Sequence, residues 1–235
     1  FTFDGTAGDA ASNRWYTVSG PVVSGQASAS LAIHRNVGGN FDAPPVTSST
    51  SVGTATFSAT TCDTGVLTYV FSDGSGRSGA IPLTRLAANV TCQATSARPA
   101  NADFAHSGNW FAESTSGQGF VMELNPASQV LFCTWYTYAP GGQAIGGAAS
   151  QRWYTAQASY AAGARSFTLT LYETTGGTFA SAATVAATKA VGTATLRFTD
   201  CQNATWQYSF TGGTNAGQAG TIALTRIGPV PAGCA

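Results

Sequence analysis

An internal repeat constrains this sequence more than any other feature. Four segments recur about 140 residues further along the chain. The matching segments are Arg14-Trp15-Tyr16-Thr17 with Arg152-Trp153-Tyr154-Thr155, Val52-Gly53-Thr54-Ala55-Thr56 with Val191-Gly192-Thr193-Ala194-Thr195, Leu83-Thr84-Arg85 with Leu224-Thr225-Arg226, and Cys62 and Cys92 with Cys201 and Cys234. The repeat predicts two tandem modules, at residues 1–98 and 99–235.

The two modules differ at their front ends. Phe1-Thr2-Phe3 aligns with Tyr136-Thr137-Tyr138, whereas residues 109–135 have no counterpart in the first module. We therefore expect the first module to lack its opening strands. The chain begins with Phe1 and not with Met, so we also expect it to be a processed or trimmed product. An incomplete sheet leaves backbone N–H and C=O groups unpaired, which favours pairing with another polypeptide. The residues expected at this interaction edge are Phe1, Thr2, Phe3, Arg14, Trp15, Tyr16 and Thr17.

Short segments of alternating polarity, separated by glycine-rich turns, predict an all-β fold. In the second module we expect strands near 109–112, 118–125, 129–138, 151–158, 165–173, 191–199, 204–211 and 218–227. Their regular spacing favours an antiparallel up-and-down barrel, with a two-sheet sandwich as the alternative. In the first module we expect a stub at 1–3 and strands near 14–19, 27–34, 52–59, 66–72 and 79–86.

Charge and hydropathy exclude several classes of function. Only 9% of residues are charged and the formal net charge is zero, so the chain has no basic surface for nucleic acid. No segment approaches the ~18 apolar residues that a membrane-spanning helix requires.

The cysteines indicate an oxidising compartment. Their placement predicts disulfides Cys62–Cys92 and Cys201–Cys234, which would make the protein secreted or exposed at the cell surface. Cys133 remains unpaired, and we expect it either to be buried as a small hydrophobic residue or to bridge to a missing piece.

Three motifs open the second module: Gly108-Asn109-Trp110, Ser116-Gly117-Gln118-Gly119-Phe120 and Trp135-Tyr136-Thr137-Tyr138. In this order they resemble a repeated β-module of secreted bacterial proteins, whose function is largely uncharacterised. The strand order and the opening G-x-W also resemble avidin-type barrels in architecture. These resemblances imply a fold and carry no activity with them.

The repeat also limits where catalytic chemistry is expected. None of the ten acidic residues has an acidic counterpart in the other module. The best catalytic candidate is Glu123, which a barrel interior would activate by raising its pKa. The alternative is that Glu123 faces solvent or pairs with Arg152 or Arg226. His34 and His106 stand in different modules without ligands at metal-site spacing, so we expect no metal and no cofactor.

Three hypotheses follow. The leading one is a non-enzymatic structural or adhesive protein whose first module is completed by strands of another chain, either a precursor fragment or a neighbouring subunit. The second is a small-molecule or carbohydrate-binding barrel with a site lined by Trp110, Glu123, Trp135 and Trp153. The third is a hydrolase that uses Glu123. We further expect Arg85 and Arg226 to close the ends of their modules by bonding to backbone carbonyls.

Overall fold

The computed structural model describes residues 1–4, 9–43, 47–86, 103–115, 117–180, 187–231 and 234. Almost all of the regular structure in these residues is β-strand, so the all-β prediction is confirmed. The short helical turns are η1 (Ala10–Ser12), η2 (Phe104–His106), η3 (Glu113–Thr115), α1 (Gly142–Ile145) and η4 (Ala148–Ser150). No helix in the described part of the chain is long and apolar enough to cross a membrane.

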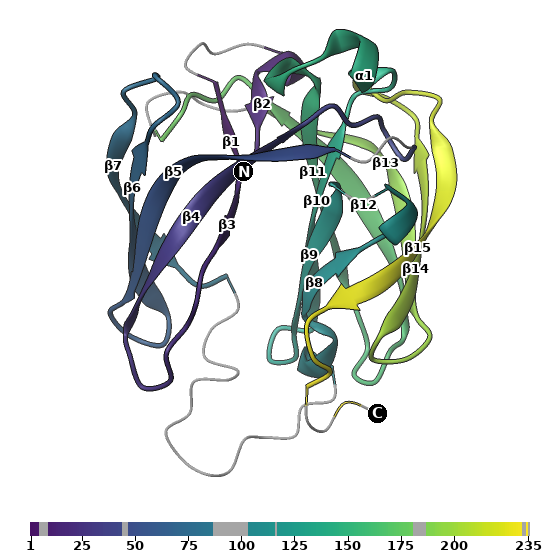
Figure 1. Cartoon of the computed structure of the whole chain (residues 1–235). Coiled ribbons are helices and arrows are strands. Elements are labelled where there is room, and N and C mark those ends of the chain that lie inside the picture. Colours follow the sequence, from purple (N-terminus) through teal and green to yellow (C-terminus); the bar gives the residue numbers. More distant parts are fainter. Residues whose placement is uncertain are drawn as a thin grey trace.

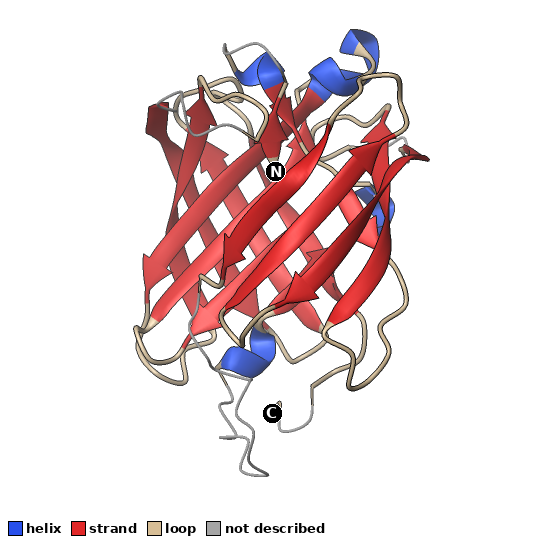
Figure 2. Ribbon diagram, turned by 90° about the vertical axis from the view of Figure 1, so that its left-hand side faces the viewer, coloured by secondary structure: helices blue, strands red, loops and turns tan. Residues whose placement is uncertain are grey.

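Eight strands form a closed antiparallel barrel (Figure 1), and Figure 2 views the molecule from the left-hand side of Figure 1, where the other strands face the viewer. They are β8 (Gly108–Phe111), β9 (Gly119–Asn125), β10 (Val130–Tyr138), β11 (Gln151–Ser159), β12 (Ser166–Thr175), β13 (Ala187–Phe198), β14 (Asn203–Phe210) and β15 (Ala219–Ile227). Each strand pairs with the next one in sequence, and β15 pairs with β8 to close the ring. The up-and-down barrel predicted for the second module is therefore confirmed over the sandwich.

Strand alternation explains the barrel core. Successive side chains of a strand point to opposite faces, and the inward positions here are large and apolar. The fully buried side chains include Trp110, Met122, Leu124, Leu131, Trp135, Tyr154, Leu169, Leu171, Leu196 and Trp206. Cys133 is a free, buried cysteine in this core, as its small hydrophobic character predicts.

The preceding part of the chain forms a five-stranded antiparallel sheet beside the barrel (Figure 1). Its strands are β3 (Thr17–Ser19), β4 (Ser28–Val37), β5 (Ser48–Ala59), β6 (Thr64–Phe71) and β7 (Ser78–Thr84). A separate pair, β1 (Thr2–Phe3) and β2 (Asn13–Arg14), lies where the sheet meets the barrel. The predicted boundary between residues 98 and 99 falls outside the described residues.

The sheet and the barrel contain a β-bulge at matching positions. The register shifts between Ile33 and His34 in the sheet, and between Leu171 and Tyr172 in the barrel. Gly53 and Gly192 lie opposite these shifts, and a Cβ on either would clash with a backbone carbonyl oxygen of the neighbouring strand. The repeated Val-Gly-Thr-Ala-Thr motif therefore needs its glycine because another backbone approaches closely.

Candidate functional site

The interior of the barrel is filled by side chains. Trp135 lies at its centre, with its ring 5.2 Å from that of Phe120 and 5.9 Å from that of Trp206, measured between centroids. The hollows found among the described residues are shallow and lie on outer sheet faces, over β13 to β15 and over β5 to β7. The cavity expected inside the barrel is replaced by a packed aromatic core.

The four residues predicted to bind a ligand are not brought together. Trp110 and Trp135 point inward, but Glu123 alternates with the inward Met122 and Leu124 and so faces outward. Trp153 also faces outward, because the neighbouring Tyr154 belongs to the core. This distribution corrects the expectation of a single cavity lined by all four.

Arg152 and Arg226, the two arginines suggested as partners for Glu123, donate to backbone carbonyl oxygens. Arg152 donates to the carbonyl oxygens of Ala149 and Gln151. Arg226 closes the barrel end: it donates to the carbonyls of Cys201, Ser107 and Ala105 at 2.7–2.8 Å. Its guanidinium carbon lies 4.7 Å from the ring centroid of Trp110, a cation–π contact. The expectation that Arg226 seals the barrel through backbone carbonyls is confirmed.

Two tryptophans make reciprocal contacts between the N-terminal part of the chain and the barrel. The indole Nε1 of Trp15 donates to the carbonyl of Thr137 at 3.2 Å, and Nε1 of Trp153 donates to the carbonyl of Thr2 at 3.1 Å. In the repeat, Trp15 matches Trp153 and Thr2 matches Thr137. The same contact is therefore made twice, once in each direction.

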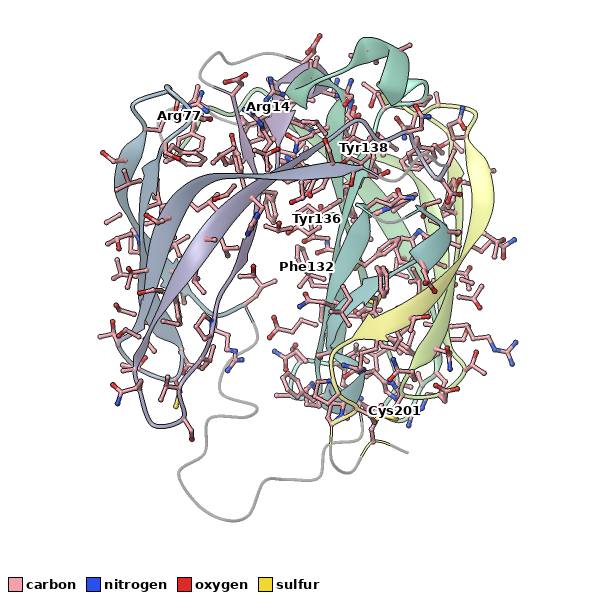
Figure 3. All side chains as sticks on the ribbon, in the orientation of Figure 1. Arg14, Arg77, Phe132, Tyr136, Tyr138 and Cys201 are labelled. Carbon is pink, nitrogen blue, oxygen red and sulfur yellow. A yellow bond between two sulfur atoms is a disulfide. The ribbon has the colours of Figure 1, made fainter. Side chains whose placement is uncertain are left out.

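Aromatic rings surround both contacts. Trp153 packs against Phe1 and Phe3, with centroids 4.6 and 5.4 Å away. Trp15 packs against Tyr136 and Tyr138, with centroids 5.8 and 5.7 Å away. Figure 3 shows Tyr136 and Tyr138 on β10, the barrel strand that faces the sheet. These rings form what we call the aromatic junction: Phe1, Phe3, Trp15, Tyr136, Tyr138 and Trp153.

A polar bond reinforces the junction. The buried side chain of Gln151 donates from Nε2 to the carbonyls of Trp15 and Asn36, at 3.0 and 3.1 Å. Hydrogen bonds in such a dry contact are costly to lose, because each freed carbonyl stays buried without water.

Two phenylalanines are exchanged between the sheet and the barrel. Phe41 follows β4 yet belongs to the barrel core, 5.2 Å from Trp135 and 5.4 Å from Tyr208. Phe179 follows β12 yet packs against the sheet, 5.7 Å from Tyr69 and 5.8 Å from Phe71. Phe41 and Phe179 occupy matching places in the repeat, so each half supplies a phenylalanine that packs in the other half. We call these two side chains the plugs.

Asp42 follows Phe41 in sequence and forms a hydrogen bond with Tyr208 of β14. We call this end of the barrel, where Phe41 enters its core, the barrel mouth. Tyr208 Oη donates to Asp42 Oδ2 at 2.6 Å. Burial raises the pKa of Asp42, and the hydrogen bond from Tyr208 offsets part of that rise. Asp42 and its repeat counterpart Ala180 both adopt left-handed backbone, with φ of 44° and 45°. The residue after each phenylalanine thus has the same backbone conformation, although one is a carboxylic acid and the other is alanine.

The residues predicted at an interaction edge have divided roles. Phe1, Thr2, Phe3 and Trp15 contact the barrel of the same chain. Arg14 forms an ion pair with Asp4 at 2.6 Å, and Tyr16 packs on Phe71 in the concave face of the sheet. Of the seven, Thr17 belongs to strand β3 at the border of the sheet. Four of the seven residues therefore contact the barrel of the same chain, and Thr17 lies on a border strand.

The five-stranded sheet has two border strands in the described part of the chain. β3 pairs with β4, β7 pairs with β6, and neither has a second hydrogen-bonded neighbour there. Its concave face carries an apolar cluster of Ile33, Val52, Ala55, Tyr69 and Phe71. The plug Phe179 covers one part of this face. Val18, Phe57 and Leu83 remain substantially exposed.

The Cys201–Cys234 disulfide predicted from the sequence is present, with a Cα–Cα distance of 6.0 Å. The other predicted pair involves Cys92, which lies outside the described residues.

Comparison with known proteins gave no match: no family model, no curated protein and no solved structure resembles this chain significantly. Function must therefore be argued from the contacts themselves.

The sequence analysis did not predict that Phe41, Phe179 and Gln151 join the sheet to the barrel. The signal for the first two was available, because a phenylalanine recurs at the same place after the same glycine pair, in Gly38-Gly39-Asn40-Phe41 and Gly176-Gly177-Thr178-Phe179. The repeat shows that the position matters, but it does not show that the side chain packs in the other half.

Proposed function

We propose that the chain contains two copies of one barrel module, and that the five-stranded sheet is an acceptor for three strands of another polypeptide. Completed in this way, the sheet would become a second eight-stranded barrel, and the protein would act as a non-enzymatic assembly or adhesion unit. The observation that carries the proposal is the exposed concave face of the sheet beside a closed barrel of matching sequence.

Matching positions differ sharply in exposure. Leu83 is 40% exposed, whereas its counterpart Leu224 is 2% exposed. Phe57 is 36% exposed and its counterpart Leu196 is fully buried. Fully burying an exposed large apolar side chain stabilises by about 1.5–3 kcal/mol, and these two side chains are already more than half buried, so completion of the sheet would recover about 1–2 kcal/mol at the two positions together.

Arg85 specifies one feature of the completing strand. Its counterpart Arg226 is buried under Trp110 and bound to carbonyls on the approach to β8. Arg85 is exposed, and it shares with Arg226 the backbone bond at the same place, Arg85 N–H to the carbonyl of Asp63. A strand of Gly-x-Trp type would lay its indole over Arg85 as Trp110 lies over Arg226.

The outer face of β10 provides a second wall for the incoming strands. Figure 3 shows Phe132 and Tyr136 on the side of the barrel that faces the sheet. Both are only partly buried. A strand added beside β3 would cover them as Trp15 already covers Tyr136 from the other side. The acceptor would thus be built from the sheet and from the barrel wall together.

An extracellular location fits this role. The Cys201–Cys234 disulfide belongs to a class of bond that persists in oxidising compartments. The low charge of the chain leaves β-strand pairing and apolar burial as the main means of association.

The test uses the chain's own opening strands as a probe. A synthetic peptide of residues 107–138 is added to the intact protein, and binding is followed by native mass spectrometry and by hydrogen exchange of the β3 and β7 amides. We expect a one-to-one complex and slowed exchange at both borders. A peptide with Trp110→Ala should bind about tenfold or more weakly, because it cannot cover Arg85.

Two variants on one strand provide the control. Leu83→Glu places a charge on the concave face and should abolish peptide binding, whereas Thr84→Glu places the same charge on the opposite face and should not. Native mass of the untreated protein supplies the second readout: where it shows a co-purifying polypeptide or an oligomer, the added peptide is expected to displace that occupant. A stable monomer that ignores the peptide would refute strand completion.

A further inference from the structure

Three potential metal ligands converge at the end of the barrel that Arg226 closes. His106 comes from η2, Cys201 follows β13, and Cys234 lies beyond β15. The imidazole nitrogen and the two sulfurs lie within 4.8 Å of one another. Figure 3 shows Cys201 at this lower end of the molecule. The two cysteines form a disulfide, so His106 faces a cystine in this state.

His106 lacks the hydrogen bonds that a buried imidazole normally makes. Its side chain has no exposed surface, and neither Nδ1 nor Nε2 has a partner among the described residues. The ring stacks on Phe198, with centroids 4.6 Å apart. Each unsatisfied buried polar atom costs about 1–3 kcal/mol, so this placement calls for a ligand.

We infer that opening the Cys201–Cys234 disulfide converts this group into a zinc site in which His106, Cys201 and Cys234 are the ligands and a fourth position takes water. A dithiol reductant supplies two electrons and two protons to the S–S bond and becomes a disulfide itself. Zn²⁺ then displaces one proton from each thiol and binds both thiolates. Two thiolates and one imidazole are an established ligand set for zinc with an open position.

The geometry requires small movements. A tetrahedral ion with Zn–S bonds of about 2.3 Å and a Zn–N bond of about 2.0 Å separates its ligand atoms by roughly 3.5–3.8 Å. The sulfurs must therefore move apart and the nitrogen must approach by about 1 Å. Cys234 is partly exposed, which gives the ion a path from solvent.

Charge makes the site specific for the reduced state. Arg165 and Arg226 act on His106 against Asp103 and Asp200, so the surroundings of the ring supply charges of both signs, and disulfide sulfurs add none. Two thiolates would add two negative charges at the ion itself. The oxidised protein is therefore expected to leave zinc unbound, and opening of the disulfide controls binding.

The test uses Co²⁺ as a spectroscopic probe in protein with Cys62→Ser and Cys92→Ser, which removes the other predicted disulfide and leaves Cys133 as a buried thiol in the barrel core. After treatment with a dithiol and its removal without oxygen, Co²⁺ should produce thiolate charge-transfer absorption, and Zn²⁺ should displace it. His106→Gln should weaken Zn²⁺ binding by more than about 100-fold, because a direct ligand contributes more than an outer-shell group. His34→Gln, which changes the other histidine, should leave binding unchanged.

The inference fails if the reduced protein shows no charge-transfer band, or if His106→Gln binds as tightly as its parent. Near-ultraviolet circular dichroism covers the case in which reduction loosens the barrel end. Zn²⁺ added with the reductant should then restore the tertiary signal in the parent and not in His106→Gln. Equal loss of signal with and without Zn²⁺ would also overturn it.

Discussion

Arg226 and Arg85 illustrate how far the role of one residue depends on its surroundings. Both follow the same Leu-Thr pair and share the same backbone bond, yet only Arg226 lies under an indole ring. The sequence predicted that Arg226 would bond to carbonyls, because a buried guanidinium with five donors has few other means of satisfaction. The sequence does not reveal what covers Arg85.

Matched leucine substitutions measure this difference in burial. Leu224→Ala should lower the free energy of unfolding by about 2–5 kcal/mol, because it leaves a cavity in a packed core. Leu83→Ala should lower it by less than about 1 kcal/mol, because that side chain remains partly in water. Urea denaturation measures both. A large loss for Leu83→Ala would mean that the concave face is already covered in solution.

Asp42 gives a prediction for pH dependence. Its pKa is raised in the folded protein, so the folded state binds this proton more tightly than the unfolded chain. The free energy of unfolding should therefore rise as pH falls through the raised pKa toward the ordinary value of 3.8, and decline at higher pH.

Asp42→Asn keeps an acceptor for Tyr208 and removes the titration. The variant should lose the part of the stability slope that lies just above pH 3.8 and should be at least as stable as the parent at neutral pH. Urea titrations at several pH values measure this slope. An unchanged slope would show that Asp42 is well hydrated in solution.

At the scale of elements, periodicity predicted the strands well but not the faces. The strand at Gln151–Ser159 was expected at 151–158, and the one at Gly119–Asn125 was expected at 118–125. Alternation indicates which residues share a face. It does not say which of two adjacent aromatic residues, Trp153 or Tyr154, points into the barrel.

Bulges explain the larger errors in strand length. The strand expected at 191–199 begins at Ala187, and the one expected at 52–59 begins at Ser48. In both cases the strand continues beyond a register shift. A bulge reverses the alternation, so a strict period of two makes the strand too short.

The exchanged plugs can be tested singly. Phe41→Ala should destabilise the barrel by about 3–5 kcal/mol, because Phe41 belongs to its core although it follows β4. Phe179→Ala should increase hydrogen exchange in β6, which carries Tyr69 and Phe71, more than in β12, its own strand. Exchange mass spectrometry measures both. If each substitution affected only the strand that precedes it in sequence, β4 or β12, the packing of each phenylalanine in the opposite half would be contradicted.

At the scale of the whole molecule, we expect the aromatic junction to make the sheet and the barrel one cooperative unit. The parent should unfold in a single calorimetric transition. Trp153→Ala removes the bond to Thr2 and the contacts with Phe1 and Phe3, so the sheet should melt below the barrel and the transition should split. Val121→Ala, an exposed change on the barrel wall, should keep one transition.

The aromatic junction depends on how the sheet and the barrel pack together, and the sequence was least informative about that packing. Composition and periodicity act within an element, whereas the junction joins residues more than a hundred positions apart, such as Trp15 and Thr137. The repeat predicted two modules without saying how they meet. Because each partner in a reciprocal contact looks like a core residue of its own module, sequence reasoning assigned Trp153 to an interior.

The exchange of Phe41 and Phe179 has a consequence for how such a chain can arise. One module carries both a plug and a mouth that accepts a plug, so a single copy is self-complementary. Residues 99–235 produced alone should form a two-fold homodimer, with each Phe179 in the mouth of the other subunit. Joining two copies in one gene would convert this contact between two chains into a contact within one chain. The association would then no longer depend on protein concentration.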